Sequence, residues 1–159
     1  MTAPALSNWG KLREPRIGIC LHYDGSASDR GAVQWLKHDP RCKVSYTYLV
    51  LDDGTIVEIA PEDARAWHAG ICRPSRKELQ YRDANSAFYG IALAAKPGDR
   101  ATPAAFAAVV VLCRRLMKKH GWTEPWRITT HKAEAWPRGR KVDPDGVLDV
   151  EAVRAAVLA

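Results

Sequence analysis

Two histidines and one aspartate are the residues of this sequence best suited to binding a metal ion. His22 lies near the end of the apolar run RIGICLHY (16–23), His131 ends WRITTH (126–131), and Asp143 follows in a basic, proline-containing stretch. Two imidazoles and one carboxylate are the ligand count of a catalytic zinc site that keeps one coordination position open for water. The spacing alone leaves open a second interpretation, in which the histidines are ordinary strand-end residues and Asp143 caps a turn.

Both histidines follow segments that have the composition of buried strands. The run 16–23 is short and apolar, and 126–131 is the second candidate of this kind. In open α/β sheets, side chains at strand ends gather along one edge, where functional sites form. We therefore expect His22 and His131 to share the rim of a cleft, with Asp143 reaching it from its loop.

The remaining elements alternate between helix and strand, which predicts an α/β fold. Capping residues and helical spacing of apolar residues predict three helices, and β-rich runs around an Asp-Gly pair predict a hairpin. Residues 61–87 are polar and irregular, and we expect a long loop with one helical turn there. The other predicted elements are a helix after Ser28, a hairpin of 44–51 with 55–60, a strand at 88–96, a helix from Thr102 to Gly121 and a last helix capped by Asp149.

The bulk composition fits one globular domain of 159 residues with a net charge of +6. The positive charge suits an anionic partner, which could be nucleic acid, an acidic membrane surface or an acidic wall polymer. No apolar run approaches the roughly 18 residues needed to cross a bilayer, and residues 1–16 lack the apolar core of an export signal. The four cysteines show no CxxC spacing and are expected to be reduced, with Cys20 in the core rather than on a metal.

Five sequence blocks follow one another in an order that is typical of one enzyme family. They are LHYDGSAS, VSYTYLVLDDGTIVEI, AWHAG, NSAFYGIAL and ITTHKAEAWPRGRKVDPDG. Together they resemble the zinc-dependent N-acetylmuramoyl-L-alanine amidases of the amidase-2 family, which is related to peptidoglycan recognition proteins and phage lysozyme-type amidases. The resemblance covers about residues 16–150. It implies a single catalytic domain (1–159, core about 16–157) with a central mixed β-sheet flanked by helices.

The resemblance also implies an activity and the residues that carry it. His22, His131 and Asp143 would bind Zn²⁺, and Tyr46 and Lys141 would face the scissile carbonyl. The reaction is hydrolysis of the amide bond between N-acetylmuramic acid and L-alanine in peptidoglycan. A positioned cation or phenol hydroxyl can stabilise the charge that builds on the carbonyl oxygen.

Some positions leave alternatives open. The ending VDPDG offers Asp145 as a second candidate ligand, although Asp143 matches better because it directly precedes a proline. Trp67, His68 and Asn85 are expected to line the peptide groove. Alternatively, Trp67 packs beneath the loop and Asn85 stabilises it. His38 and His120 end predicted helices, where an imidazolium suits the helix dipole, and we assign them no chemistry.

The expected role is that of a phage or prophage endolysin. Recycling amidases of the family carry a glutamate in the strand that here reads GIALAA, whereas the pair Tyr46 and Lys141 is closer to the phage lysozyme-type branch. We expect a monomer that lies in the cytoplasm without a signal peptide and reaches the cell wall after holin-type release. The alternatives are a cytoplasmic anhydro-muropeptide recycling amidase and a non-catalytic peptidoglycan-recognition module. A nucleic-acid-binding role lacks a supporting motif.

Overall fold

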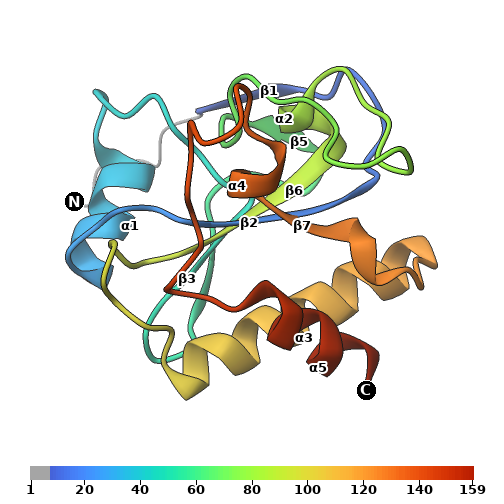
Figure 1. Ribbon diagram of the computed structural model, residues 1–159. Coiled ribbons are helices and arrows are strands. Elements are labelled where there is room, and N and C mark those ends of the chain that lie inside the picture. Colours follow the sequence, from blue (N-terminus) through green and yellow to red (C-terminus); the bar gives the residue numbers. More distant parts are fainter. Residues whose placement is uncertain (1–7) are drawn as a thin grey trace.

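A five-stranded mixed sheet forms the centre of the computed structural model, which describes residues 8–159 (Figure 1). The strand order is β4-β3-β6-β2-β7. Strands β3, β6, β2 and β7 run parallel to one another, and β4 is antiparallel to β3. This confirms the predicted α/β class and mixed sheet. The strands are β2 (Gly18–Tyr23), β3 (Tyr48–Val50), β4 (Ile56–Glu58), β6 (Phe88–Leu93) and β7 (Ile128–Thr130).

The predicted hairpin and helices are present, with shorter strands than the β-rich runs suggested. Strands β3 and β4 pair with Tyr48 opposite Glu58. The helix caps follow the predicted side chains, since Ser28 Oγ accepts from Gly31 N at 3.1 Å and Asp149 accepts from two backbone amides of the last helix. The helices are α1 (Asp29–His38), α2 (Ala84–Ala87), α3 (Pro103–His120), α4 (His131–Glu134) and α5 (Val150–Leu158), with a 3-10 turn at Pro125–Arg127.

A second, two-stranded sheet is one of the elements that the sequence did not predict. β1 (Trp9–Lys11) pairs antiparallel with β5 (Ala64–Ala66). Each strand has only three residues, which is too short for an alternating pattern to be recognised. β5 lies inside the segment 61–87 that was predicted to be a loop, and α2 supplies the single helical turn expected there.

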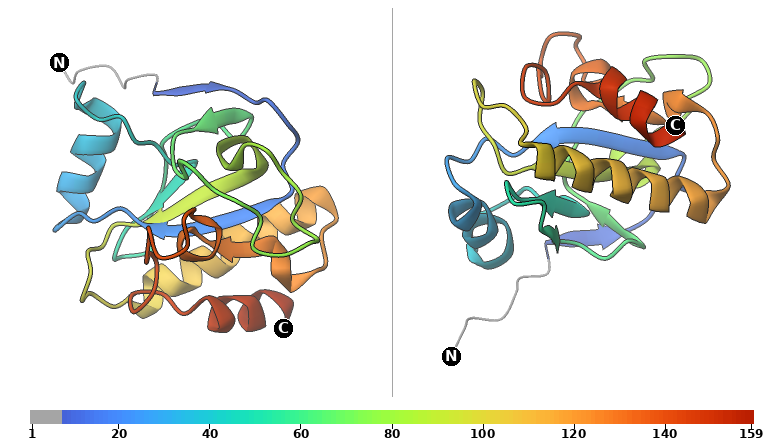
Figure 2. Two further views of the ribbon diagram at one scale, coloured as in Figure 1. Left: turned by 45° about the horizontal axis from the view of Figure 1, so that its top comes forward. Right: turned by 90° about the horizontal axis from the view of Figure 1, so that it is seen from below.

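Alternation of side chains gives the large sheet two different faces. Ile19 and Leu21 of β2 and Ile91 of β6 point toward α3 and α5, in the larger apolar core. Figure 2 shows these two helices lying across one side of the sheet. The intervening residues, including Cys20 and Ala92, point to the opposite face, where α1 and the loop segments pack. The opposite face is therefore the one available to carry a site.

Three further expectations from the sequence concern cysteines, membranes and export. The four cysteines are free thiols, and Cys20 is fully buried in the core as predicted. Within residues 8–159, no helix is both long enough and apolar enough to span a bilayer. The expectation about an export signal concerns residues 1–16, of which 1–7 lie outside the described residues.

A buried arginine connects the segments that surround β6. Arg16 Nη1 donates to the carbonyl oxygens of Ser86 and Phe88, both at 2.9 Å. Its Nη2 donates to the carbonyl oxygens of Glu62 at 3.0 Å and Ala64 at 2.5 Å. Because one guanidinium satisfies carbonyls from β5, α2 and β6, it stabilises the arrangement of all three.

We expect Arg16→Met to lower the free energy of unfolding by roughly 3 kcal/mol or more, because several carbonyls that lose their donor stay buried. Urea denaturation followed by circular dichroism measures the change. Arg30→Met, at an exposed position of α1, is the matched control and should change stability by less than about 0.5 kcal/mol. Equal stabilities of the two variants would contradict this account of Arg16.

Candidate functional site

His22, His131 and Asp143 meet on the sheet face opposite α3, at the carboxyl ends of two neighbouring parallel strands. His22 is the penultimate residue of β2, and His131 directly follows β7. Asp143 Oδ2 lies 3.0 Å from His22 Nδ1 and 3.1 Å from His131 Nδ1. All three side chains are buried. The structure thus brings together the three residues that were predicted to form one group, and their role as ligands stays a prediction.

The donor atoms of this group fit a divalent cation. His131 Nε2 lies 2.9 Å from the carbonyl oxygen of Ala69. Since a carbonyl only accepts, Nε2 carries a hydrogen, and Nδ1 is the ring nitrogen directed at Asp143. Burial lowers the pKa of His22 to about 4, so that imidazole is neutral near pH 7. Nitrogen lone pairs and a carboxylate oxygen within 4.8 Å of one another are the donor set that zinc prefers.

Two neighbouring residues are less suitable as ligands. Cys20 lies near His22 on the same face, but burial raises the pKa of its thiol well above the usual value, so it stays protonated. Asp145 is exposed and pairs with Lys132 at the surface. Of the two aspartates that the sequence offered, the geometry therefore favours Asp143.

A cavity of about 600 Å³ opens over the His22–His131–Asp143 group, and Tyr46 and Lys141 both line it. The ring of Tyr46 lies with its centroid 5.2 Å from that of His22. Burial raises the pKa of the Tyr46 phenol, so its hydroxyl keeps its proton and can donate a hydrogen bond. Lys141 is exposed, so its ammonium group reaches the cavity from the solvent side. The cavity thus combines two donors with the candidate metal ligands.

Trp67 and Asn85 also line the cavity. Trp67 is half-buried, and the guanidinium of Arg65 stacks over its ring at 4.5 Å. Asn85 Oδ1 accepts from the backbone N–H groups of His68 at 3.0 Å and Ala69 at 2.8 Å. Asn85 therefore holds the loop in place, which was the alternative considered from the sequence, and its contact with a substrate stays a prediction.

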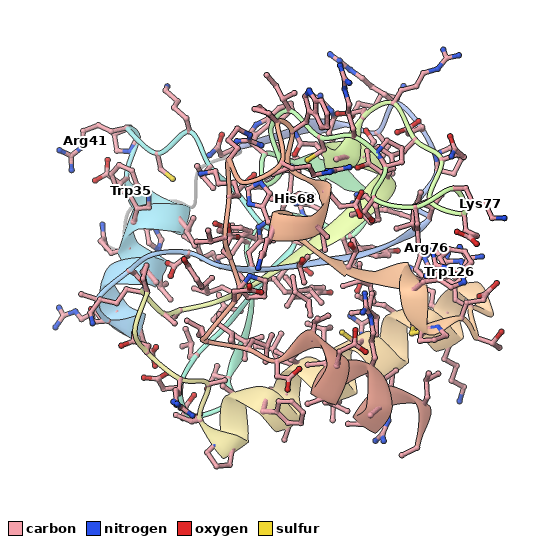
Figure 3. All side chains as sticks on the ribbon, viewed as in Figure 1. Trp35, Arg41, His68, Arg76, Lys77 and Trp126 are labelled. Atoms are coloured by element: carbon pink, nitrogen blue, oxygen red, sulfur yellow. The ribbon has the colours of Figure 1, made fainter. Side chains whose placement is uncertain are left out.

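His68 lies deeper than the sequence suggested. Its side chain is buried, and Figure 3 shows it toward the middle of the molecule, whereas Trp35 and Arg41 lie at the edge near α1. His68 Nδ1 lies 2.9 Å from His22 Nε2, and its Nε2 lies 3.2 Å from the carbonyl oxygen of Phe88. Both ring nitrogens are therefore engaged within the protein, although the ring borders the cavity.

The family model described as N-acetylmuramoyl-L-alanine amidase (amidase-2) matches residues 13–146. The chain belongs to the N-acetylmuramoyl-L-alanine amidase family. The resemblance drawn from the five sequence blocks, and the expectation of an enzyme of this class, are confirmed. None of the curated protein sequences compared with this amidase matches it.

Solved structures share the fold of this amidase at low sequence identity. A selenomethionine AmpD derivative is 22% identical, with a TM-score of 0.75 over 98% of this chain and 92% of its own. N-acetylmuramoyl-L-alanine amidase LysC from Clostridium intestinale URNW is 21% identical, with a TM-score of 0.64 over 96% and 89%. The E. coli amidase AmiD, bound to the substrate anhydro-N-acetylmuramic acid-L-Ala-D-gamma-Glu-L-Lys, is 22% identical, with a TM-score of 0.72 over 89% and 58%. At these identities, the likeness establishes a common fold.

Sequence reasoning missed one buried acid of the amidase, Glu134. Its carboxyl group accepts from Tyr81 Oη at 2.6 Å, Thr129 Oγ1 at 2.8 Å and Ser75 N at 3.1 Å, and it also bonds to the Ser75 hydroxyl. The side chain is fully buried three residues after His131. Glu134 therefore holds the segment around Ser75 against the helix that begins with a candidate ligand. The only signal of Glu134 in the sequence was its position three residues after His131.

We expect Glu134→Gln to destabilise the amidase by about 2–4 kcal/mol. The carboxyl oxygen that accepts hydrogen bonds is replaced by an amide N–H₂ group, which cannot accept from the buried hydroxyls of Tyr81 and Thr129. Amide hydrogen exchange should accelerate in residues 73–81. Glu78→Gln is the matched control, since Glu78 is exposed in the same segment and pairs with Arg76 at the surface. Unchanged exchange in Glu134→Gln would show that this carboxyl group does not hold the segment.

Proposed function

We propose that this chain is a zinc-dependent amidase that hydrolyses the bond between N-acetylmuramic acid and L-alanine in bacterial peptidoglycan. The observation that carries the proposal is the convergence of His22, His131 and Asp143 below a cavity, in a chain whose family model is that of these amidases. Zinc held by the three residues would supply a Lewis acid and activate water for attack on the amide carbonyl.

The other residues of the cavity suit the remaining needs of the reaction. The amide carbonyl gains negative charge in the transition state, and the Tyr46 hydroxyl and the Lys141 ammonium group are donors that can stabilise it. The proton that the attacking water loses must reach the departing amine, and Lys141, at the solvent side of the cavity, would be the group that carries it. The cavity walls formed by Trp67 and Asn85 would hold the stem peptide.

We infer that the physiological substrate is the cell wall itself, as for an endolysin. Position 92 of β6 and positions 94 and 95 just after it are alanines, where the recycling branch of the family would have a glutamate. The protein would then reside in the cytoplasm and reach peptidoglycan after holin-type release, and its net charge of +6 would favour an anionic envelope. A recycling role is the second candidate, supported by the fold shared with AmiD bound to an anhydro-muropeptide.

The experiment that tests the activity measures release of free L-alanine amino termini from purified sacculi. The protein is assayed as purified, after chelation, and after zinc is returned. Loss with chelation and recovery with zinc support the amidase, whereas binding to sacculi without release identifies a recognition module. The same assay on soluble anhydro-muropeptides separates the two roles, because a recycling amidase prefers the soluble substrate.

Replacement of the two aspartates tests the ligand set. We expect Asp143→Ala to weaken zinc binding by more than about 100-fold, because losing a ligand costs more than losing a supporting partner. Asp145→Ala should leave the affinity unchanged, since Asp145 pairs with Lys132 at the surface. Competition with a chromophoric chelator measures both. The opposite pattern would assign Asp145 as the ligand.

Replacement of the two donors tests the transition-state role. We expect Tyr46→Phe and Lys141→Met each to lower kcat about 10²- to 10³-fold, the loss typical of one oxyanion donor. Zinc affinity should stay unchanged because neither side chain is a proposed ligand. Lys96→Met, at an exposed turn, serves as the charge control. Full kcat in both variants would remove these residues from the mechanism.

A further inference from the structure

A second histidine supports the candidate ligand His22 from the side opposite Asp143. His22 uses Nδ1 toward Asp143 and Nε2 toward His68, whose Nδ1 lies 2.9 Å away. The two imidazole rings meet edge to face, with an interplanar angle of 85°. Both side chains are buried. Water therefore has little access to this contact, so each ring nitrogen must find its hydrogen-bonding partner within the protein.

The carbonyl oxygen of Phe88 gives this chain of contacts a direction. It lies 3.2 Å from His68 Nε2 and also accepts from Arg16 Nη1 at 2.9 Å. A carbonyl can only accept, so His68 Nε2 carries the hydrogen of the neutral ring and His68 Nδ1 is an acceptor. His22 must then donate from Nε2. As a consequence, the lone pair of His22 lies on Nδ1, which faces Asp143.

We infer that His68 is a positioning residue, which fixes the tautomer and ring orientation of His22 for metal binding under the direction of the Phe88 carbonyl. The inference rests on the proposed zinc function of His22. It assigns to His68 an action through His22 rather than the substrate contact expected from the sequence. Ligating histidines commonly donate their second ring nitrogen to a supporting partner, and losing that partner typically weakens metal binding about 10- to 100-fold.

Gly90 of β6 provides the space that this arrangement needs. A Cβ at position 90 would lie 2.6 Å from His68 Cγ and 2.9 Å from His68 Cδ2, well inside van der Waals contact. The backbone of Gly90 is fixed by Thr47, which donates from N to its carbonyl oxygen at 2.8 Å and accepts its N–H through Oγ1 at 3.1 Å. The missing side chain of Gly90 therefore allows the imidazole of His68 to lie against β6.

A purely space-filling role does not account for these contacts. Leucine could occupy much of the same volume, but it offers no acceptor, so the Nε2–H of His22 would stay buried without a partner. Asparagine is smaller, yet its Oδ1 can take the place of Nδ1 and accept from His22. The two replacements therefore separate hydrogen bonding from packing at position 68.

The test compares zinc affinity in wild type, His68→Asn, His68→Leu and Gly90→Ala by chelator competition. We expect about 10- to 100-fold weaker binding in His68→Leu and Gly90→Ala, with His68→Asn closer to wild type. His120→Leu, which removes an imidazole bonded to Tyr89 away from the cavity, is the control and should bind as wild type does. Wild-type affinity in His68→Leu overturns the inference.

Nuclear magnetic resonance of the zinc-loaded wild type provides a readout that does not depend on any variant folding. With ¹⁵N-labelled histidine, we expect Nε2–H tautomers for His22 and His68, with the His22 Nε2–H shared with His68 Nδ1. A hydrogen on His68 Nδ1 overturns the inference. If His22→Ala abolishes zinc binding while His68→Leu does not, the zinc proposal stands and only this inference fails. If the wild type binds no zinc, both fail.

Discussion

The site depends on holding two buried imidazoles against one buried carboxylate. His131 is oriented by the carbonyl oxygen of Ala69, and His22 faces Asp143 with its Nδ1. Both Nδ1 atoms lie within 3.1 Å of the same carboxylate oxygen, so the geometry depends on the backbone segments that hold the two rings. On this side of the sheet, the loop and strand contacts hold in place the backbone carbonyl groups of Ala69 and Phe88, which orient the histidine rings.

One face of the sheet contributes mainly to stability, and the other carries the candidate site. Side chains such as Ile19 and Ile91 bury apolar surface against α3 and α5 and supply most of the hydrophobic core. The opposite face carries small residues, including Gly90 and Ala92, which leave room for imidazole rings close to the strands. Because β2 and β7 are parallel neighbours, the residues at their carboxyl ends lie side by side at the same edge of the sheet.

Much of the fold was predictable because its signals are local. Helix α3 lies between Thr102 and Gly121 as predicted, since a capping hydroxyl and a left-handed glycine act within a few residues of the helix ends. The strand-end histidines followed from the same kind of local pattern. The grouping of Asp143 with them needed the family motif as well, because 121 residues separate it from His22.

The parts that escaped prediction depend mainly on groups that are distant in the sequence. Arg16 bonds to carbonyls 46 to 72 positions away, and nothing in its own neighbourhood in the sequence indicates this. The buried acid Glu134 and the two short strands β1 and β5 share the same difficulty. His68 was identified as a residue of interest, but its direction into the protein depends on the space left at Gly90.

Asn85 gives the site a kinetic property as well as a shape. Its single amide oxygen accepts the backbone N–H groups of both His68 and Ala69, and these two residues contact the two candidate ligand rings. Local opening of this loop would therefore remove one hydrogen-bonding partner from each imidazole in one event while the sheet stays folded. Both rings would then lose their fixed orientation at the opening rate of the loop rather than at the rate of global unfolding.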